Sequence, residues 1–166
     1  MRVAILLEDY VEESEFLYPF YRFQEEGWEV TIVAPEVREY KGKNGLKFTS
    51  DTAIEEGMEN KFDMVFIPGG YAPDRLRRNE RILKFVKNMF MQGKPVCTIC
   101  HGPWVLISAG IIKDKKVTGY YAIKDDIINA GGIYSGAPFE KDGNLFTAQD
   151  PKAMPRYLKF IIDSLK

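Results

Sequence analysis

The sequence predicts an α/β domain in which a mostly parallel sheet is covered by helices on both faces. Short apolar runs of strand length alternate with longer segments of helical periodicity along the 166 residues. The apolar runs are nearly continuous, which is typical of strands buried on both faces. The length suits one domain with a substantial core, and no repeat or linker interrupts the alternation. We therefore predict a single domain over residues 1–166.

The individual elements follow from the apolar pattern and from turn residues. Asn44-Gly45 within "YKGKNGLKFTS" predicts a β-hairpin over residues 40–50. The last third is less regular, with a short helix between two strands. The predicted strands are 2–7, 28–34, 62–70, 95–100, 116–121 and 143–148, and the predicted helices are 12–27, 73–92, 102–110, 123–132 and 151–166.

Composition and charge exclude several classes of function. The net charge is −1 and acidic and basic residues are mixed, so no basic nucleic-acid-binding or membrane-binding patch is expected. The first apolar run is too short for a signal peptide or a membrane span. Two cysteines are too few for a disulfide scaffold, and in a reducing compartment they stay thiols. We expect a cytoplasmic protein without nucleic-acid or membrane partners.

The segment "TICHGP" places the only histidine, His101, directly after Cys100. Cys100 ends a predicted strand and a helix starts at Gly102, which resembles a nucleophile elbow at the carboxyl edge of the sheet. The nearby helix N-terminus favours a thiolate and a lowered pKa. We predict that Cys100 is the nucleophile and that His101 assists it; a buried structural cysteine and a helix-capping histidine are the alternatives.

Cys97 lies three residues earlier, within the same predicted strand. Residues three apart on a strand point to opposite faces, which opposes a disulfide or redox role for "CTIC". Two cysteines and one histidine also leave a four-ligand zinc site incomplete. Cys97 is therefore expected to be a packing residue, and no metal site is predicted.

Glu12 and a glycine pair are predicted to complete the site. The helical stripe Phe16, Pro19, Phe20 and Phe23 extends back to Glu12, whereas Glu13 and Glu15 are expected in solvent. A partly buried Glu12 would have a raised pKa. When protonated it could hydrogen-bond the Cys100 sulfur and later exchange a proton with substrate; a helix N-terminal acid is the alternative. Gly69 and Gly70 allow close backbone approach and supply oxyanion donors, or simply form a tight turn.

Four segments together resemble one known family. They are "EDYVEESEFLYPFYRFQEEGWEV", "FIPGGYAPDRLRRNE", "GKPVCTICHGPWVLISAG" and "YAIKDDIINAGG". In order and spacing they resemble the PfpI-type intracellular proteases, part of a class I glutamine amidotransferase-like superfamily that includes glyoxalase III, protein deglycases and redox-responsive chaperones. The resemblance covers essentially the whole chain.

The resemblance implies a flavodoxin-like three-layer sandwich with the cysteine on a nucleophile elbow. By matching motifs, the nucleophile is Cys100, its hydrogen-bonding glutamate is Glu12 and its adjacent histidine is His101. Backbone at Gly70 and His101 would supply oxyanion donors, and Tyr120 would face the substrate. Homodimers or homohexamers are implied, and in hexamers an acidic residue from a neighbouring subunit orients the histidine. That position is Asp74, where the family pattern has the longer glutamate.

Three functions are consistent with these residues. The first is a cysteine-dependent enzyme of glyoxalase III or deglycase type, which acts on reactive dicarbonyls or glycated protein adducts. The second is an ATP-independent cysteine protease that uses Asp74 of another subunit on a peptide substrate. The third is a stress-responsive holdase chaperone or redox sensor at Cys100. None requires a cofactor. The aromatic residues Tyr18, Tyr21, Trp104 and Tyr121 are compatible with either core or interface positions.

Overall fold

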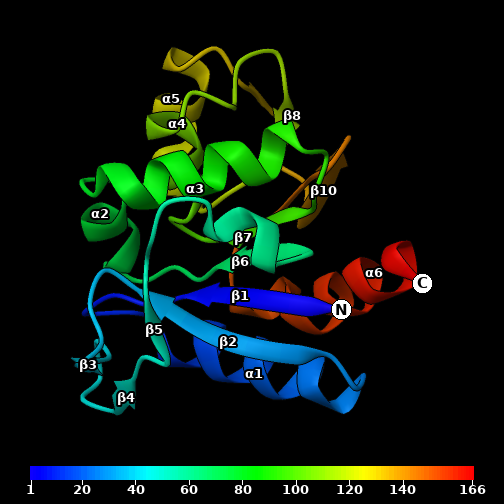
Figure 1. Ribbon diagram of the computed structural model, residues 1–166. Helices are drawn as coiled ribbons and strands as arrows, with labels where there is room; N and C mark the ends of the chain where they lie inside the picture. Colours follow the sequence, from blue (N-terminus) through cyan, green and yellow to red (C-terminus); the bar gives the residue numbers. More distant parts are fainter.

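A seven-stranded sheet forms the centre of the protein in the computed structural model, which describes residues 1–166 (Figure 1). The strand order is β10-β11-β7-β6-β1-β2-β5, and only β10 runs antiparallel to its neighbour. The strands of this sheet are β1 (Arg2–Leu6), β2 (Glu29–Ala34), β5 (Thr52–Ala53), β6 (Met64–Ile67), β7 (Val96–Ile99), β10 (Phe139–Asp142) and β11 (Leu145–Ala148). The predicted parallel α/β fold is confirmed.

Helices cover both faces of this sheet. In Figure 1, α1 and α6 lie on one face, and α3, α4 and α5 lie on the other. The helices are α1 (Glu13–Glu25), α2 (Ala72–Leu76), α3 (Glu80–Met91), α4 (Pro103–Ser108), α5 (Lys124–Asn129) and α6 (Met154–Leu165), with short 3₁₀ helices η1 (Met58–Lys61), η2 (Tyr121–Ile123) and η3 (Pro151–Ala153). The three-layer sandwich therefore has the arrangement that the sequence predicts.

The core consists of two apolar clusters, one on each side of the sheet. Along β1, Val3 and Ile5 belong to the cluster under α1 and α6, whereas Ala4 and Leu6 belong to the cluster under α3 and α4. Successive side chains of a strand point to opposite faces, so a strand covered on both sides must be apolar throughout. This explains the continuous apolar runs in the sequence.

Two local predictions differ in outcome. The hairpin is confirmed as β3 (Glu39–Lys41) and β4 (Lys47–Thr49), paired antiparallel. The single helix predicted over 73–92 is wrong, because the chain forms α2 and α3 with a break between them. The side chain of Asn79 accepts hydrogen bonds from the N–H groups of Arg81 and Ile82, so it caps a new helix start.

The last third of the chain contains short strands that the sequence pattern predicts only in part. β8 (Lys116–Val117) and β9 (Ile133–Tyr134) form a separate parallel pair around α5. The antiparallel edge strand β10 has the polar sequence "FEKD" and gives no strand signal of its own. Its pairing with the apolar β11 determines it instead.

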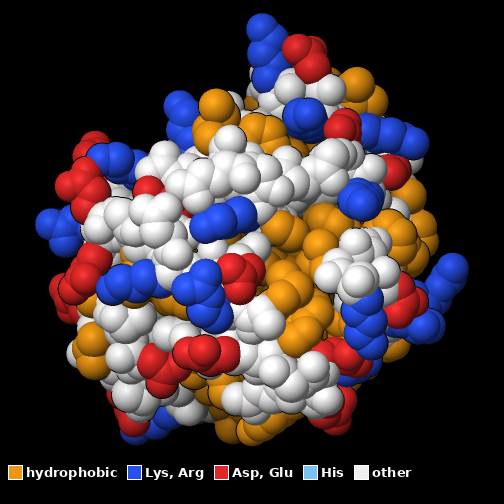
Figure 2. Space-filling view, turned by 45° about the vertical axis from the view of Figure 1, so that its right-hand side comes forward, with side chains coloured by type: hydrophobic (Ala, Val, Ile, Leu, Met, Phe, Trp, Pro, Cys, Tyr) orange, Lys and Arg blue, Asp and Glu red, His pale blue; other side chains and the backbone are white.

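The visible surface is mixed in charge. Figure 2 shows acidic and basic side chains interspersed over one face, with apolar side chains between them. None of the helices combines the length and the apolar composition that a membrane span requires.

Tyr157 fixes α6 against the sheet directly behind the carboxyl end of β7. Its fully buried hydroxyl accepts a hydrogen bond from the N–H of Thr98 at 3.1 Å. It also lies 2.7 Å from the carbonyl oxygen of Phe146 and 3.0 Å from that of Thr98, to which it can donate. The strand that ends at Cys100 is thereby tied to the C-terminal helix.

We expect Tyr157→Phe to lower the free energy of unfolding by about 1–3 kcal/mol, because buried backbone groups lose their hydrogen-bonding partner. Urea unfolding monitored by circular dichroism measures this change. Tyr18→Phe is the matched control, because Tyr18 is an exposed tyrosine. An equal change in the two variants would contradict this role of Tyr157.

Candidate active site

Cys100 lies on a sharp turn between β7 and α4. Its φ is +61°, in the left-handed region that non-glycine residues rarely adopt. Two backbone hydrogen bonds hold this turn: the Cys100 N–H donates to Ala148 at 3.0 Å, and the Tyr120 N–H donates to the Cys100 carbonyl at 2.8 Å. The geometry is that of the predicted nucleophile elbow.

The elbow requires a glycine two residues after the cysteine. A Cβ on Gly102 would collide with the hydroxyl of Thr98 and would lie only 2.9 Å from the carbonyl oxygen of Ile99. Only a residue without a side chain lets α4 start this close to the strand. This is the physical reason for "CHGP" at the turn.

His101 contacts Cys100 directly. Its Nδ1 lies 3.2 Å from the Sγ of Cys100. Burial, together with the positive charge of Lys43, lowers the pKa of His101, while Asp126 opposes this shift. The imidazole is therefore neutral at pH 7 and can accept a proton from the thiol.

The carboxyl group beside Cys100 belongs to Glu15, and the prediction that Glu15 lies in solvent is wrong. Its side chain is almost fully buried, and its Oε2 accepts a hydrogen bond from the N–H of Gly69 at 2.7 Å. Its second oxygen is buried without a hydrogen-bond partner. Glu15 precedes Pro19 by four residues, so the apolar periodicity of α1 could have identified it.

Glu12 has the opposite environment from the one predicted. α1 begins at Glu13, so Glu12 has extended backbone and its side chain leaves the apolar stripe. Its carboxylate pairs with Nζ of Lys43 at 2.6 Å and accepts a hydrogen bond from the hydroxyl of Ser14 at 2.9 Å. Burial alone would raise the pKa of Glu12, but these two contacts outweigh burial and lower it. The predicted raised pKa is wrong for Glu12.

Burial raises the pKa of Glu15 to about 7. The hydrogen bond from Gly69 lowers this pKa, and the negative charge of Glu12 raises it further. Burial, and after it the charge of Glu15, raises the pKa of the Cys100 thiol to about 12. The expected lowering by the helix N-terminus is wrong, because burial and the carboxylate outweigh it. The two groups titrate together, so a proton held on Glu15 removes the charge that opposes a Cys100 thiolate.

Backbone N–H groups face the sulfur. Hydrogen bonds from the N–H groups of Gly70 and His101 lower the pKa of Cys100, although less than burial raises it. Gly70 has a φ of +77°, and a Cβ there would lie 2.6 Å from the carbonyl oxygen of Tyr10. A Cβ on Gly69 would overlap Glu15 and lie 2.7 Å from the Cβ of Cys100. Glycine is required at both positions for the carboxyl and the thiol to meet.

These groups surround a pocket of about 360 Å³. Cys100 is 9% exposed and lines this pocket, so its sulfur is not sealed in the core. Tyr120 lies at the wall, with its ring stacked on His101 at 5.1 Å between centroids. The pocket is lined by Glu12, Glu15, Lys43, Gly70, Tyr71, Cys100, His101, Tyr120 and Pro151. Sequence reasoning missed Lys43, which extends from the hairpin turn.

Asp74 does not line this pocket. It lies on α2, exposed, with its carboxylate paired to Arg78 at 3.0 Å. Within one chain it therefore does not contact His101. Cys97, by contrast, is fully buried on β7 beside Phe146, in the packing environment that the sequence predicts.

Comparison with known proteins identifies the family. The family model described as "DJ-1/PfpI family" matches residues 1–164. The chain belongs to this family. Among its relatives, a Pyrococcus abyssi protein named a deglycase is 41% identical over 166 residues, which is the full length of both. The Pyrococcus furiosus protein named Deglycase PfpI is 39% identical, again over the full length of both.

Solved structures agree with this assignment. The chain superposes with a TM-score of 0.96 and 39% identity on a two-domain protein of Anabaena variabilis that contains DJ-1/ThiJ/PfpI-like and ferritin-like domains. The superposition covers 99% of this chain but only 48% of the Anabaena protein, so this chain corresponds to about half of that protein. Drosophila melanogaster DJ-1beta, with a TM-score of 0.90 and 24% identity, shares the fold.

The two carboxyl groups predict opposite pH dependences of stability. The pKa of Glu15 rises from 4.5 to about 7 on folding, so its contribution is greatest below pH 4.5 and is lost as the pH rises through about 7. Relative to Glu15→Gln, the wild type should lose about 3 kcal/mol of unfolding free energy over this interval. Urea unfolding at a series of pH values measures the difference.

Glu12→Gln is the internal control, because the pH dependence of the stability that Glu12 contributes has the opposite sign. The pKa of Glu12 is lowered on folding, so its stabilisation is present above the ordinary glutamate pKa and disappears on acidification. Glu12→Gln should therefore be less stable than the wild type at neutral pH and equal to it in acid. Parallel curves for the wild type and Glu15→Gln would contradict the burial of that carboxyl.

Proposed function

We propose that this DJ-1/PfpI family member is a deglycase whose nucleophile is Cys100. It would act on the adducts that dicarbonyls such as methylglyoxal form with amino groups, and on the free dicarbonyl in a glyoxalase III-type reaction. One observation carries the proposal: the Cys100 sulfur opens into a pocket between a carboxyl group with a pKa of about 7 and a neutral imidazole. Full-length relatives with deglycase names support it.

In the adduct, the former aldehyde carbon carries the amine and a hydroxyl group. The hydroxyl proton passes to the nitrogen, the carbon–nitrogen bond breaks and the amine leaves, which regenerates the aldehyde. Cys100 then attacks this aldehyde carbon. The Cys100 sulfur forms a bond to this carbon, and the thiol proton passes to Nδ1 of His101, which lies 3.2 Å away. The electron pair of the carbonyl moves to its oxygen. The N–H groups of Gly70 and His101 face the reacting centre and can stabilise the charge there. Protonated Glu15 can then give its proton to the oxygen.

The second stage converts the hemithioacetal on Cys100 into the acid. A proton moves from the carbon bonded to sulfur to the neighbouring carbon. The first carbon is thereby oxidised to a thioester and the second is reduced to an alcohol, so no external oxidant is required. Water then cleaves the thioester and yields a hydroxy acid and the free thiol. Glu15 suits both directions of proton transfer because its pKa lies near neutrality.

The size and walls of the pocket fit this substrate class. A volume of about 360 Å³ holds a small carbonyl unit, while the amine-bearing chain can extend outward. The Lys43–Glu12 ion pair and Tyr120 line this space. Tyr120 is 43% exposed, which places its ring where an entering substrate would contact it.

Substitutions at Cys100 and Glu15 test the mechanism. Cys100→Ala should abolish turnover of methylglyoxal-modified N-acetyl-lysine, since no other thiol lines the pocket. Glu15→Gln should lower kcat/KM by about 10²–10⁴-fold, the usual contribution of a general acid–base. Glu12→Gln, which leaves Glu15 in place, should lower it by less than about tenfold. Lactate release measured by a coupled assay gives these values; a greater loss for Glu12→Gln than for Glu15→Gln would contradict the proposed roles.

A peptidase function is the second candidate, and it depends on Asp74. Because Asp74 is exposed and lies outside the pocket, only a neighbouring subunit could bring it to His101. We propose assembly as a homodimer or homohexamer in the cytoplasm, with exposed aromatic residues such as Tyr18 and Tyr21 available for contacts.

Asp74 variants decide between the two activities. If the protein is a peptidase with an intersubunit triad, Asp74→Ala should lower cleavage of a fluorogenic peptide by at least about tenfold, and Asp74→Glu should retain or increase it. Deglycase turnover should be unchanged in both variants. Peptide cleavage that is equal in wild type and Asp74→Ala would contradict the intersubunit triad.

A further inference from the structure

Two aromatic rings enclose the imidazole of His101. Tyr120 stacks on it with an interplanar angle of 28°, and Trp104 meets it edge-to-face at 66° with 5.0 Å between centroids. Stacked and edge-to-face arrangements of this kind are the favoured geometries of aromatic rings and restrict how the rings can turn. The side chain of His101 has one polar contact, Nδ1 to the sulfur of Cys100. Its orientation therefore depends on packing rather than on a hydrogen-bonded carboxylate.

Trp104 is itself held in place from two sides. Its indole Nε1 donates a hydrogen bond to Oδ2 of Asp126 on α5 at 2.9 Å. The guanidinium of Arg77 lies over its ring at 5.4 Å and donates through Nε to the hydroxyl of Ser108 at 2.9 Å. The indole thus joins α4 to α5 while its edge contacts His101.

We infer that Trp104 is the positioning residue for His101, and that Asp126 holds Trp104 in the required orientation. Consecutive side chains usually diverge, so the contact of His101 with its sequence neighbour Cys100 needs a constraint from elsewhere. Trp104 and Tyr120 supply it from within one chain, whereas Asp74 does not reach the histidine in that chain. The indole keeps Nδ1 directed at the sulfur, where it accepts the thiol proton.

This inference extends the proposed function, because the step it assists is proton removal from Cys100. Its central test does not depend on a substrate. The chain contains a single histidine, so ¹⁵N-histidine labelling gives NMR signals from His101 alone. The ¹⁵N shifts report which ring nitrogen carries the proton, and their pH dependence reports the pKa.

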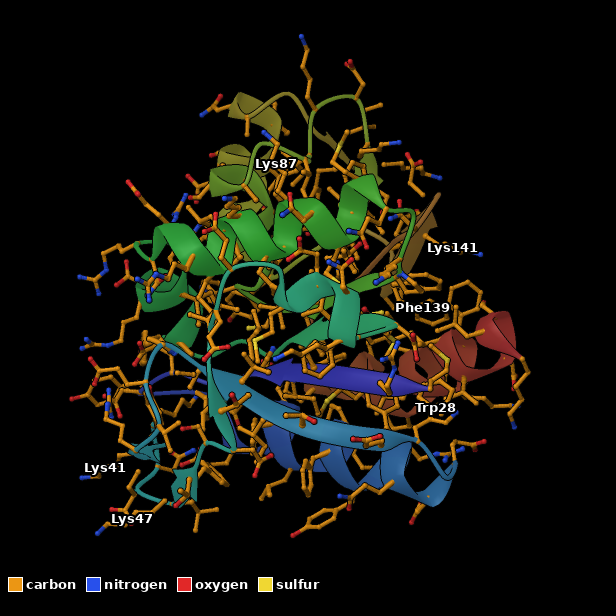
Figure 3. All side chains as sticks on the ribbon, in the orientation of Figure 1. Trp28, Lys41, Lys47, Lys87, Phe139 and Lys141 are labelled. Carbon is orange, nitrogen blue, oxygen red and sulfur yellow. The ribbon has the colours of Figure 1, made fainter.

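Trp104→Ala should shift the Nδ1 and Nε2 signals toward a mixture of tautomers, because the ring is free to turn away from the sulfur. Trp104→Phe keeps an aromatic edge and should preserve the wild-type shifts to a large extent. Trp28→Phe is the matched control. Trp28 lies at the amino end of β2, away from the carboxyl edge that carries the site, and it stacks on Phe23 (Figure 3).

Asp126 has a control on the same helix. Lys43, from the hairpin, lowers the pKa of His101 and Asp126 raises it, so Asp126→Asn should move the titration of His101 to lower pH. Asp125 is also exposed and lies in the same first turn of α5, but it does not bond to Trp104. Asp125→Asn should therefore leave the titration and the tautomer unchanged.

The kinetic readout separates positioning from binding. On methylglyoxal-modified N-acetyl-lysine, Trp104→Ala should lower kcat on the order of 10- to 100-fold, since misplacement of a catalytic group has effects of this size, with KM changed far less. Trp104→Phe should restore most of kcat. Circular dichroism and urea unfolding must show that both variants are folded.

The results distinguish failure of this inference from failure of the proposed function. Wild-type His101 signals in folded Trp104→Ala would overturn the positioning role, whatever the activity. Equal losses of kcat in Trp104→Phe and Trp104→Ala, with equal His101 signals, would overturn it as well. If wild-type protein has no deglycase turnover but Trp104→Ala changes the His101 tautomer, the proposed substrate is wrong and the positioning role holds.

Discussion

The site depends on a carboxyl group buried against a thiol. Taking a carboxylate out of water is costly unless it is paired. Glu15 accepts a hydrogen bond from the N–H of Gly69, but its other oxygen is buried without a partner. The protein meets this cost by raising the pKa of Glu15 to about 7, so that the neutral acid is accessible under physiological conditions. The same carboxyl acts on the sulfur: after burial, its charge is the next largest cause of the raised pKa of Cys100, and its protonation removes this contribution. Burial in the same region of the protein therefore raises the pKa values of both Glu15 and Cys100.

The backbone around this pair is strained, and the surrounding structure holds it. A cysteine at a φ of +61° costs about 1–3 kcal/mol relative to relaxed backbone. The hydrogen bond that Cys100 donates to Ala148 on β11 and the one that it accepts from Tyr120 fix that conformation on both sides of the residue. The glycines at 69, 70 and 102 remove the Cβ atoms that would keep α1, the β6 loop and α4 apart. The sulfur is raised into the pocket because these three elements can approach so closely.

The three glutamates at the start of α1 make different polar contacts. Lys43 and Ser14 keep the carboxylate of Glu12 ionised. Glu13 accepts hydrogen bonds from the backbone and side chain of Asn44 in the hairpin turn. Glu13 thereby fixes the turn that carries Lys43 to the pocket. Glu15 faces the sulfur. Three carboxyl groups within four residues have three environments because each meets a different part of the fold.

The sequence by itself determined the layered α/β architecture, the elbow at Cys100 and the pairing of Cys100 with His101. These depend on local signals: apolar runs buried on both faces, a glycine at a tight turn, and a single histidine next to the cysteine. Helical spacing leaves two glutamates next to the apolar stripe of α1, Glu12 and Glu15, and the structure decided between them. α1 starts at Glu13, so Glu12 has extended backbone outside the helix, and only Glu15 faces the sheet. Lys43 was likewise beyond local signals, since a hairpin distant in sequence brings it to the pocket. Trp104 lies only three residues after His101, but its hydrogen bond to Asp126 on α5 depends on the tertiary structure.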